Sequence, residues 1–347
     1  MSPARVLVVD DSAAMRAMLC RILSQDPLLE VVGCAADPAE ARTMIKELNP
    51  DVLTLDVEMP GMDGLTFLER IMRLRPMPVV MCSTLTARGT EVTIEALRLG
   101  AVDCIAKPTA SAGDLAAAAD ILCRTVREAA RSQARAFTSA PLPRAAAGGG
   151  WRQDMVILVG ASTGGVEALF SFLGALPPDA PPVVVVQHMP AGFTGGFADR
   201  LDKTVPPRVL HGRDGLPLLN GQVLIAPAGE CHAEITASAQ PQLRLKPGPL
   251  HGGHRPAVDR LFASATPLGS RAVGVLLTGM GRDGAEGLLA LRSAGAATFA
   301  QSADSCVVYG MPRAAVELGA AGEIVSLHRM ADAVLRACRA TSLTRTE

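Results

Sequence analysis

The sequence has few aromatic residues and almost no net charge. Eight Phe, one Tyr and one Trp make up 3% of the 347 residues, so the cores must be built from Val, Leu, Ile, Ala and Met. The formal net charge is −1. Because proteins that bind nucleic acids or acidic membrane surfaces carry a basic excess, this balance argues against both partners. The hydrophobic share of 49% is still enough for two ordinary cores, and the length predicts about two domains.

The chain is also expected to lack a secretion signal, a membrane span and a structural zinc site. The first apolar run meets Asp10 and Asp11 too early for a signal peptide. The uncharged stretch at 180–198 contains three prolines and three glycines, which is unlike a membrane-spanning helix. The eight cysteines stand singly, without a CxxC pair. This pattern predicts reduced, mostly buried cysteines in a soluble cytoplasmic protein.

Two α/β regions are separated by a stretch of different composition. Residues 1–127 and 153–347 each alternate short apolar runs with helix-length segments, whereas 128–152 is rich in Ala, Ser, Arg, Pro and Gly. Repeated βα units predict parallel sheets covered by helices on both faces, and the intervening stretch predicts a linker. A helix is expected at Ser12–Leu23, and strands are expected at Arg5–Asp10, Val31–Cys34, Val52–Asp56, Val79–Cys82, Ala101–Ala106, Met155–Val159, Val183–Gln187, Gln222–Ala226 and Ala272–Thr278.

Polar residues follow the predicted strands of the first domain where each strand ends. Asp10 and Asp11 follow the first strand, Asp56 ends the third, Ser83 follows the fourth and Lys107 follows the fifth. Ligands of open α/β sheets bind at these ends. Clustered carboxylates favour a hard cation such as Mg²⁺, and a carboxylate can accept a group covalently. Each fragment alone would be ordinary loop polarity, but their placement at successive strand ends predicts a phosphoryl-acceptor site.

The blocks VDDS, DVLTLDVEMPGMDGL and AKP resemble the response-regulator receiver family over residues 4–125. The resemblance implies a flavodoxin-like doubly wound sheet and phosphorylation of Asp56. It also implies Mg²⁺ bound by Asp10, Asp11 and Asp56, with Lys107 contacting the phosphate.

The same resemblance implies a phosphate-sensing hydroxyl at Ser83, although the adjacent Thr84 could compete for this role. It also implies a cis peptide bond before Pro108. Receivers often carry a switch aromatic three residues before the lysine, and here that position is Cys104. Signal output by rotation of an aromatic ring is therefore not expected in its usual form.

The second domain opens with a serine in a glycine-rich turn. Residues 160–164 read GASTG, which satisfies the G-x-S-x-G pattern after a predicted strand. A tight strand-to-helix turn would expose the hydroxyl of Ser162, and backbone N–H groups of the following helix could stabilise an oxyanion. A turn that binds phosphate, or that only packs, is the alternative.

A serine nucleophile needs a base and a carboxylate that orients the base. His188 follows the run VVVVQ and Asp283 lies in the turn GMGRDGA, so both stand at predicted strand ends. Glu286 and Asp259 rank lower because they fall in predicted helices. The order Ser, His, Asp differs from that of α/β-hydrolases. The remaining histidines, two of which lie three apart without a third metal ligand, are expected in loops or polar segments: His211, His232, His251, His254 and His328.

Further blocks resemble the chemotaxis protein-glutamate methylesterase family over nearly all of residues 155–320: VGASTGG, VVVVQHMP, VLIAPAG, HRPAVDRLF, LLTGMGRDGA and YGMPRAA. The resemblance implies a second doubly wound α/β domain in which Ser162 is the nucleophile, His188 the base and Asp283 its orienter. Backbone N–H groups near Thr163 and Met280 would form the oxyanion hole, and no cofactor is implied in this domain.

Together the two resemblances imply a phosphorylation-activated hydrolase for chemotactic adaptation. It would demethylate glutamate methyl esters, and deamidate glutamines, on methyl-accepting chemoreceptors. A chemotaxis histidine kinase would be the phosphodonor, and the unphosphorylated receiver is expected to cover the esterase cleft. One rival is a non-enzymatic regulator that holds a phosphate or nucleotide in the VGASTGG turn. Another is a receiver-linked hydrolase of small esters or lipids, which the scarcity of aromatics disfavours.

Overall fold

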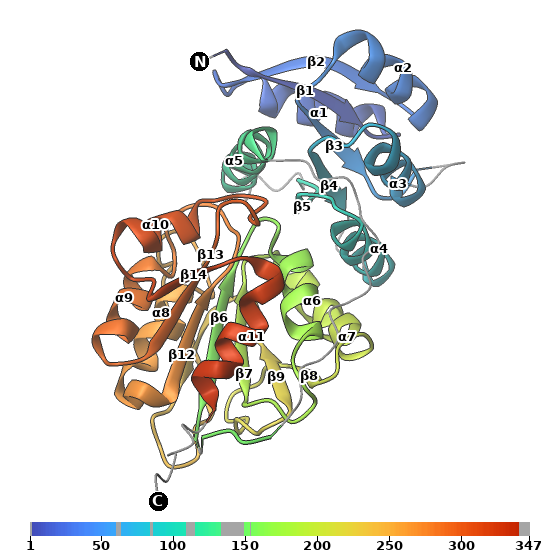
Figure 1. Cartoon of the computed structure of the whole chain (residues 1–347). Helices are drawn as coiled ribbons and strands as arrows, with labels where there is room; N and C mark the ends of the chain where they lie inside the picture. The colour runs from blue at the N-terminus through green and yellow to red at the C-terminus, as the bar shows by residue number, and fades with distance from the viewer. Residues whose placement is uncertain are drawn as a thin grey trace, which may run out of the picture. The chain divides into compact units, whose positions relative to one another are not determined.

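The computed structural model describes residues 2–59, 64–83, 86–108, 115–132, 149–152 and 154–339 (Figure 1). Contacts divide the chain into two units, Met1–Ala140 and Pro141–Glu347, each with its own parallel sheet and alternating helices. This confirms the predicted α/β class for both. Much of the predicted linker lies outside the described residues. Within the described ranges, no helix combines the length and apolar character that a bilayer crossing requires.

The described part of the first unit forms a five-stranded parallel sheet in the order β2-β1-β3-β4-β5. Its strand order reverses beside β1, which places a ligand crevice at the carboxyl ends of β1 and β3. Strand β3 is buried along its whole length because helices cover both faces of the sheet. The elements are β1 (Ala4–Val9), α1 (Ala13–Leu23), β2 (Leu29–Ala35), α2 (Pro38–Leu48), β3 (Val52–Asp56), α3 (Gly64–Leu74), β4 (Val79–Ser83), α4 (Ala87–Arg98), β5 (Asp103–Ala106) and α5 (Leu115–Arg131).

Polar caps begin the first two helices of this unit. The hydroxyl of Ser12 accepts a hydrogen bond from the N–H of Met15. The carboxylate of Asp37 accepts two N–H groups of α2, and Pro38 occupies the first helical position, where its missing N–H costs nothing. The cap at Ser12 starts α1 directly after the two acidic residues that end β1.

The described part of the second unit contains a seven-stranded parallel sheet in the order β14-β13-β12-β6-β7-β9-β8, and an antiparallel ribbon of β10 and β11. The elements are β6 (Val156–Ala161), α6 (Gly165–Gly174), β7 (Val183–Gln187), η1 (Ala191–Phe193), α7 (Thr194–Asp202), β8 (Arg208–His211), β9 (Gln222–Ile225), β10 (Cys231–Ile235), β11 (Leu243–Pro247), α8 (Val258–Ser264), η2 (Thr266–Arg271), β12 (Ala272–Leu276), α9 (Ala285–Ser293), β13 (Ala297–Gln301), α10 (Met311–Glu317), β14 (Glu323–Val325) and α11 (Leu327–Cys338).

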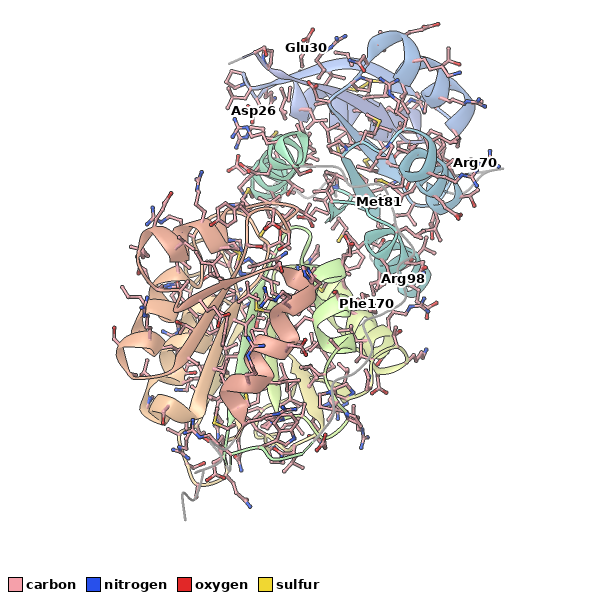
Figure 2. The ribbon with its side chains drawn as sticks, in the orientation of Figure 1. Asp26, Glu30, Arg70, Met81, Arg98 and Phe170 are labelled. Carbon is pink, nitrogen blue, oxygen red and sulfur yellow. A yellow bond between two sulfur atoms is a disulfide. The ribbon has the colours of Figure 1, made fainter. Side chains whose placement is uncertain are left out.

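The switch point of the second sheet lies at its centre. Strand β6 pairs with β7 on one side and with β12 on the other, so the chain leaves β6 in one direction and later returns to its opposite edge. Helices α8, α9 and α10 pack together, while α6 and α11 contact one another across the sheet from them (Figure 1). Core side chains such as Met81 of β4 and Phe170 of α6 are buried, whereas Arg70 of α3 is exposed (Figure 2).

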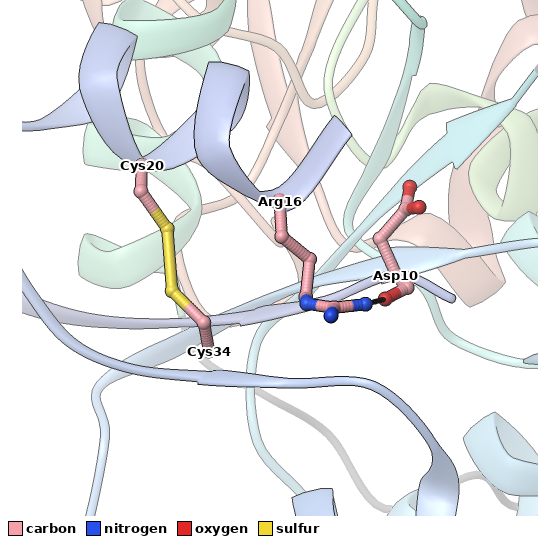
Figure 3. Close-up of a disulfide and its surroundings, with 4 residues drawn as sticks. All are labelled: Asp10, Arg16, Cys20 and Cys34. Carbon is pink, nitrogen blue, oxygen red and sulfur yellow. Dashed lines mark hydrogen bonds between the residues drawn. A yellow bond between two sulfur atoms is a disulfide. The ribbon is translucent and has the colours of Figure 1, made fainter. Parts of the chain in front are cut away.

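One cysteine pair departs from the expectation of single, reduced cysteines. Cys20 of α1 and Cys34 of β2 are joined in a disulfide, with their Cα atoms 7.7 Å apart (Figure 3). The expectation is wrong for this pair because α1 packs against β2 and brings the two side chains together. The other cysteines are free, as predicted; Cys123 and Cys231 are half-buried, and the buried ones are Cys82, Cys104, Cys306 and Cys338.

Candidate functional sites

Ser162 lies where β6 turns into α6. The helix begins at Gly165, and Gly164 before it has a φ of +74°, a conformation that favours glycine. A side chain at Gly165 would collide with the amide oxygen of Gln187 on the neighbouring strand. The N–H of Ser162 donates to the carbonyl of Thr278 at 3.1 Å. These contacts hold the serine, which is 8% exposed, at the predicted strand-to-helix turn.

His188 and Asp283 form the hydrogen-bonded pair that the sequence predicts. Nε2 of His188 lies 2.8 Å from Oδ2 of Asp283. At the start of α8, the N–H groups of Val258 and Asp259 donate to the same carboxylate at 2.7 and 2.9 Å. Burial alone would raise the pKa of Asp283, but the hydrogen bonds from His188 and the two amides hold this pKa at about 2. The ionised carboxylate therefore selects the tautomer of His188 that carries its proton on Nε2.

Strand register brings the serine and the histidine side by side. Ala161 of β6 lies opposite Gln187 of β7, and Ser162 and His188 are the next residues on each strand. The side-chain amide of Gln187 donates to the carbonyl oxygens of Ser162 and His188, at 2.9 Å each. Nε2 of His188 is turned to Asp283. The other ring nitrogen, Nδ1, is buried and has no hydrogen-bond partner among the described residues. A buried, unpartnered imidazole nitrogen on the strand end next to that of a serine suits a general base.

The structure brings Thr163 and Met280 to this serine from two turns. Thr163 is 3% exposed, and its carbonyl accepts a hydrogen bond from the hydroxyl of Thr278 at 3.1 Å. Met280 follows Gly279, where a Cβ atom would lie only 2.8 Å from Cβ of Ser162. Both turns therefore reach the serine. The role of their N–H groups as an oxyanion hole stays a prediction.

A second histidine, which the sequence analysis expected in a loop or polar segment without a role, lies against His188. The ring of His254 stacks on that of His188, with centroids 3.8 Å apart and planes inclined by 3°. The pattern HGGH at 251–254 could have indicated a tight turn, because two glycines favour a two-residue hairpin. Contrary to expectation, His211 and His232 lie in strands β8 and β10.

Asp10, Asp11 and Asp56 meet at the carboxyl ends of β1 and β3, with ligand oxygens within 4.8 Å of one another. The ammonium of Lys107 lies 2.8 Å from Asp10 and 2.8 Å from Asp56. Burial, together with the charge of Asp10, raises the pKa of Asp56 above its usual value, although Lys107 lowers it. Burial lowers the pKa of Lys107, but its two carboxylate partners raise it overall. This all-oxygen donor set could hold a metal, and it fits Mg²⁺, since one ammonium leaves three carboxylates underneutralised.

Ser83 and Lys107 lie next to one another at the ends of β4 and β5. Ser83 is buried, and its carbonyl accepts a hydrogen bond from the N–H of Lys107 at 2.9 Å. The bond before Pro108 is not among the cis bonds of the described residues. The cis prediction is therefore wrong: Lys107 reaches both carboxylates without a cis bond after it. Thr84 lies outside the described residues.

Comparisons with known proteins match both units. Residues 157–334 match the CheB methylesterase family, and residues 6–120 match the response regulator receiver domain. The chain is 53% identical over 346 residues to the protein-glutamate methylesterase/protein-glutamine glutaminase 1 of Caulobacter vibrioides, with 96% of this chain and 98% of that protein covered. It is 49% identical over 340 residues to the protein of the same name from Rhizobium johnstonii, with 96% of each covered. The Thermotoga maritima CheB methylesterase catalytic domain is a similar solved structure, with a TM-score of 0.51 and 34% identity over 52% of this chain and 97% of that chain.

Proposed function

The chain belongs to the CheB methylesterase family and carries a response regulator receiver domain, and from this premise we propose that Ser162, His188 and Asp283 carry out its hydrolysis. The protein is a protein-glutamate methylesterase and protein-glutamine glutaminase that acts in chemotaxis adaptation. Its substrates are methylated glutamate side chains of chemoreceptors. The observation that carries the assignment of residues is the His188–Asp283 hydrogen bond of 2.8 Å, which leaves Nδ1 of the histidine for the serine.

The reaction runs in two halves at one serine. Nδ1 of His188 takes the proton of the Ser162 hydroxyl as the oxygen attacks the ester carbonyl, and Asp283 stabilises the imidazolium through Nε2–H. The N–H groups of Thr163 and Met280 stabilise the oxyanion of the tetrahedral intermediate. The C–O bond to methoxide breaks, and His188 returns the proton so that methanol leaves.

Water completes the cycle. His188 removes a proton from water, which attacks the acyl-serine ester, and the ester bond to Ser162 breaks as His188 returns the proton to the serine oxygen. The products are the restored enzyme and the glutamic acid side chain, which releases its proton to solvent and becomes the carboxylate. A glutamine side chain presents the same carbonyl, and there ammonia leaves in place of methanol.

Methanol release from methylated receptor membranes tests this assignment. Ser162→Ala should lower kcat by at least about 10⁴-fold, because the acyl-enzyme can no longer form. Wild type that releases no methanol, with or without a phosphodonor, would refute the proposed function. A Ser162→Ala variant with near-wild-type release would instead refute the assignment of the nucleophile.

We also propose that Asp56 accepts the phosphoryl group from a chemotaxis histidine kinase. Asp10, Asp11 and Asp56 would hold Mg²⁺, which when bound neutralises charge on the phosphoryl oxygens. Lys107, which pairs with Asp56 and Asp10, would contact those oxygens, and the Ser83 hydroxyl would be the sensing group. The new group adds charge of about −1.5 to −2. Asp56→Asn should abolish the rise in methanol release on adding a phosphodonor while basal release persists, and a full rise in that variant would refute this acceptor.

A further inference from the structure

A two-glycine hairpin carries His254 onto the catalytic histidine. The backbones of His251 and His254 exchange two hydrogen bonds of 3.0 Å each. Between them, Gly252 and Gly253 have φ values of +58° and +87°. Two successive residues with positive φ make a tight primed turn that glycine alone adopts without cost. The backbone at His254 therefore has little freedom relative to that at His251.

The segment around this hairpin is fastened to the rest of the domain. The guanidinium of Arg255 donates to the carbonyls of Gly229 and Gly248, at 2.6 and 2.7 Å. The buried His232 accepts the N–H of Ala257 on Nδ1 at 3.2 Å, and its Nε2 lies 2.8 Å from the carbonyl of Pro249. A histidine in this arrangement must donate from Nε2. These bonds hold both flanks of the hairpin, so the position of the His254 ring is set by the fold.

The ring of His254 restrains the plane of the His188 ring, which the hydrogen bond to Asp283 does not. One hydrogen bond from Nε2 of His188 to Asp283 fixes a single point of the imidazole and leaves the ring plane able to rock about that point. A parallel ring at 3.8 Å covers one face of His188 and fixes the plane. The bond and the stack together define the direction in which the unpartnered Nδ1 points.

We propose that His254 is a positioning residue that acts through His188: its ring holds the plane of the base so that Nδ1 faces the hydroxyl of Ser162. The inference rests on the proposed function, in which Nδ1 takes the serine proton. Misplacing a reacting group by about 1 Å can cost about 100-fold in rate. Loss of one of two restraints should cost less, about tenfold in kcat, with KM little changed because the substrate contacts remain.

Three variants of the full-length chain separate this role from others. His254→Ala removes the ring, His254→Phe keeps an aromatic ring without ionisable nitrogens, and His251→Ala changes the exposed partner across the same turn while keeping its backbone bonds. We expect His254→Ala to lower kcat about tenfold with KM within about twofold, and His254→Phe to recover kcat to within about threefold of wild type. His251→Ala should match wild type. Thermal unfolding of each variant checks that the domain remains folded.

A second measurement does not depend on turnover. Two-dimensional ¹H–¹⁵N spectra of the imidazole rings report the tautomer and mobility of His188. His254→Ala should broaden or shift the His188 signals toward a mixture of tautomers, and His254→Phe should restore a single form. If wild type released no methanol, the proposed function would fail while this measurement still tested the stack.

Three results would overturn the positioning role. The first is wild-type kcat in His254→Ala together with unchanged His188 signals. The second is His254→Phe as slow as His254→Ala, which would mean that a nitrogen of His254, and not its ring plane, is required. The third is a raised KM with unchanged kcat in His254→Ala, which would make the residue a substrate contact.

Discussion

Asp283→Asn is the sharpest test of whether the charged carboxylate of Asp283 keeps the ring proton of His188 on Nε2. The carboxylate accepts His188 Nε2–H and the N–H of Val258 on Oδ2, at 2.8 and 2.7 Å, and the N–H of Asp259 on Oδ1, at 2.9 Å. Donors therefore approach both oxygens. An amide of the same shape has one oxygen, so its NH₂ group must face at least one of these donors.

The new amide can take two orientations, and these determine the expected losses in kcat and in the free energy of unfolding. With its oxygen toward Asp259, the NH₂ group faces His188 and donates to Nε2, which moves the ring proton to Nδ1 and removes the base. The equivalent exchange in a serine-protease triad lowers kcat by about 10⁴. The N–H of Val258 would then be buried without an acceptor, at a cost of about 1–3 kcal/mol in the free energy of unfolding. With the amide reversed, the N–H of Asp259 loses its acceptor instead.

Methanol release at saturating methylated receptor and urea unfolding measure the two effects. We expect kcat to fall by about 10³–10⁴, with an unfolding free energy lower by about 1–3 kcal/mol. Asp259→Asn is the matched control, since it changes the carboxyl at the start of α8 that lies beside Asp283 and keeps the Asp283 carboxylate that pairs with His188. An Asp283→Asn variant with kcat within tenfold of wild type would refute the reasoning on the tautomer.

Asp259→Asn should itself stabilise the protein at pH 7. Burial, with the charge of Asp283, raises the pKa of Asp259 from 3.8 to about 6. The folded state therefore holds this proton more tightly than the unfolded state, and the free energy of unfolding falls as pH rises between these two values. After a discount for solvent screening of the partly buried carboxyl, the fall is about 1–2 kcal/mol. Calorimetry should find the variant's melting temperature above that of wild type at pH 7 and close to it near pH 4, and equal curves at both would contradict the assignment. Gly279→Ala should lower kcat about 10–100-fold, because the new Cβ would lie 2.8 Å from Cβ of Ser162, and unchanged methanol release would show that the serine does not depend on this contact. Removing Mg²⁺ with a chelator should abolish labelling of Asp56 by radiolabelled acetyl phosphate while basal methanol release persists, and full labelling without Mg²⁺ would refute the metal site.

Much of the fold follows from local pattern. The predicted strands Val52–Asp56 and Val183–Gln187 match β3 and β7 at both ends, because each is a buried, mostly apolar run that starts after a strand-breaking Asp or Pro and ends in a polar residue. Sequence reasoning missed five strands: β8, β10, β11, β13 and β14. All but β13 lie at a sheet edge or in the two-stranded ribbon, whereas β13 pairs with β12 and β14 inside the large sheet. In β14, which has three residues, and in the alternating β11, pairing with a neighbour supplies the strand and the local sequence carries little signal.

The sequence by itself determined the chemistry at the strand ends. Ser162, His188 and Asp283 each follow an apolar strand, and a parallel sheet necessarily gathers such ends at one edge, so their proximity could be predicted without coordinates. The same reasoning placed Asp56 beside Asp10.

Only the tertiary structure decided how those groups are oriented. The bond to Asp283 is on Nε2 of His188, so Nδ1 is the nitrogen that we propose as the base, and nothing in the spacing of residues distinguishes the two nitrogens. The stack of His254 on His188 joins positions that lie 66 residues apart (254 minus 188) through a hairpin anchored elsewhere in the domain. Likewise, the link between Cys20 and Cys34 depends on how α1 packs against β2. Local pattern specifies which residues stand at a strand end, but ring planes and side-chain partners depend on packing between segments that the sequence keeps apart.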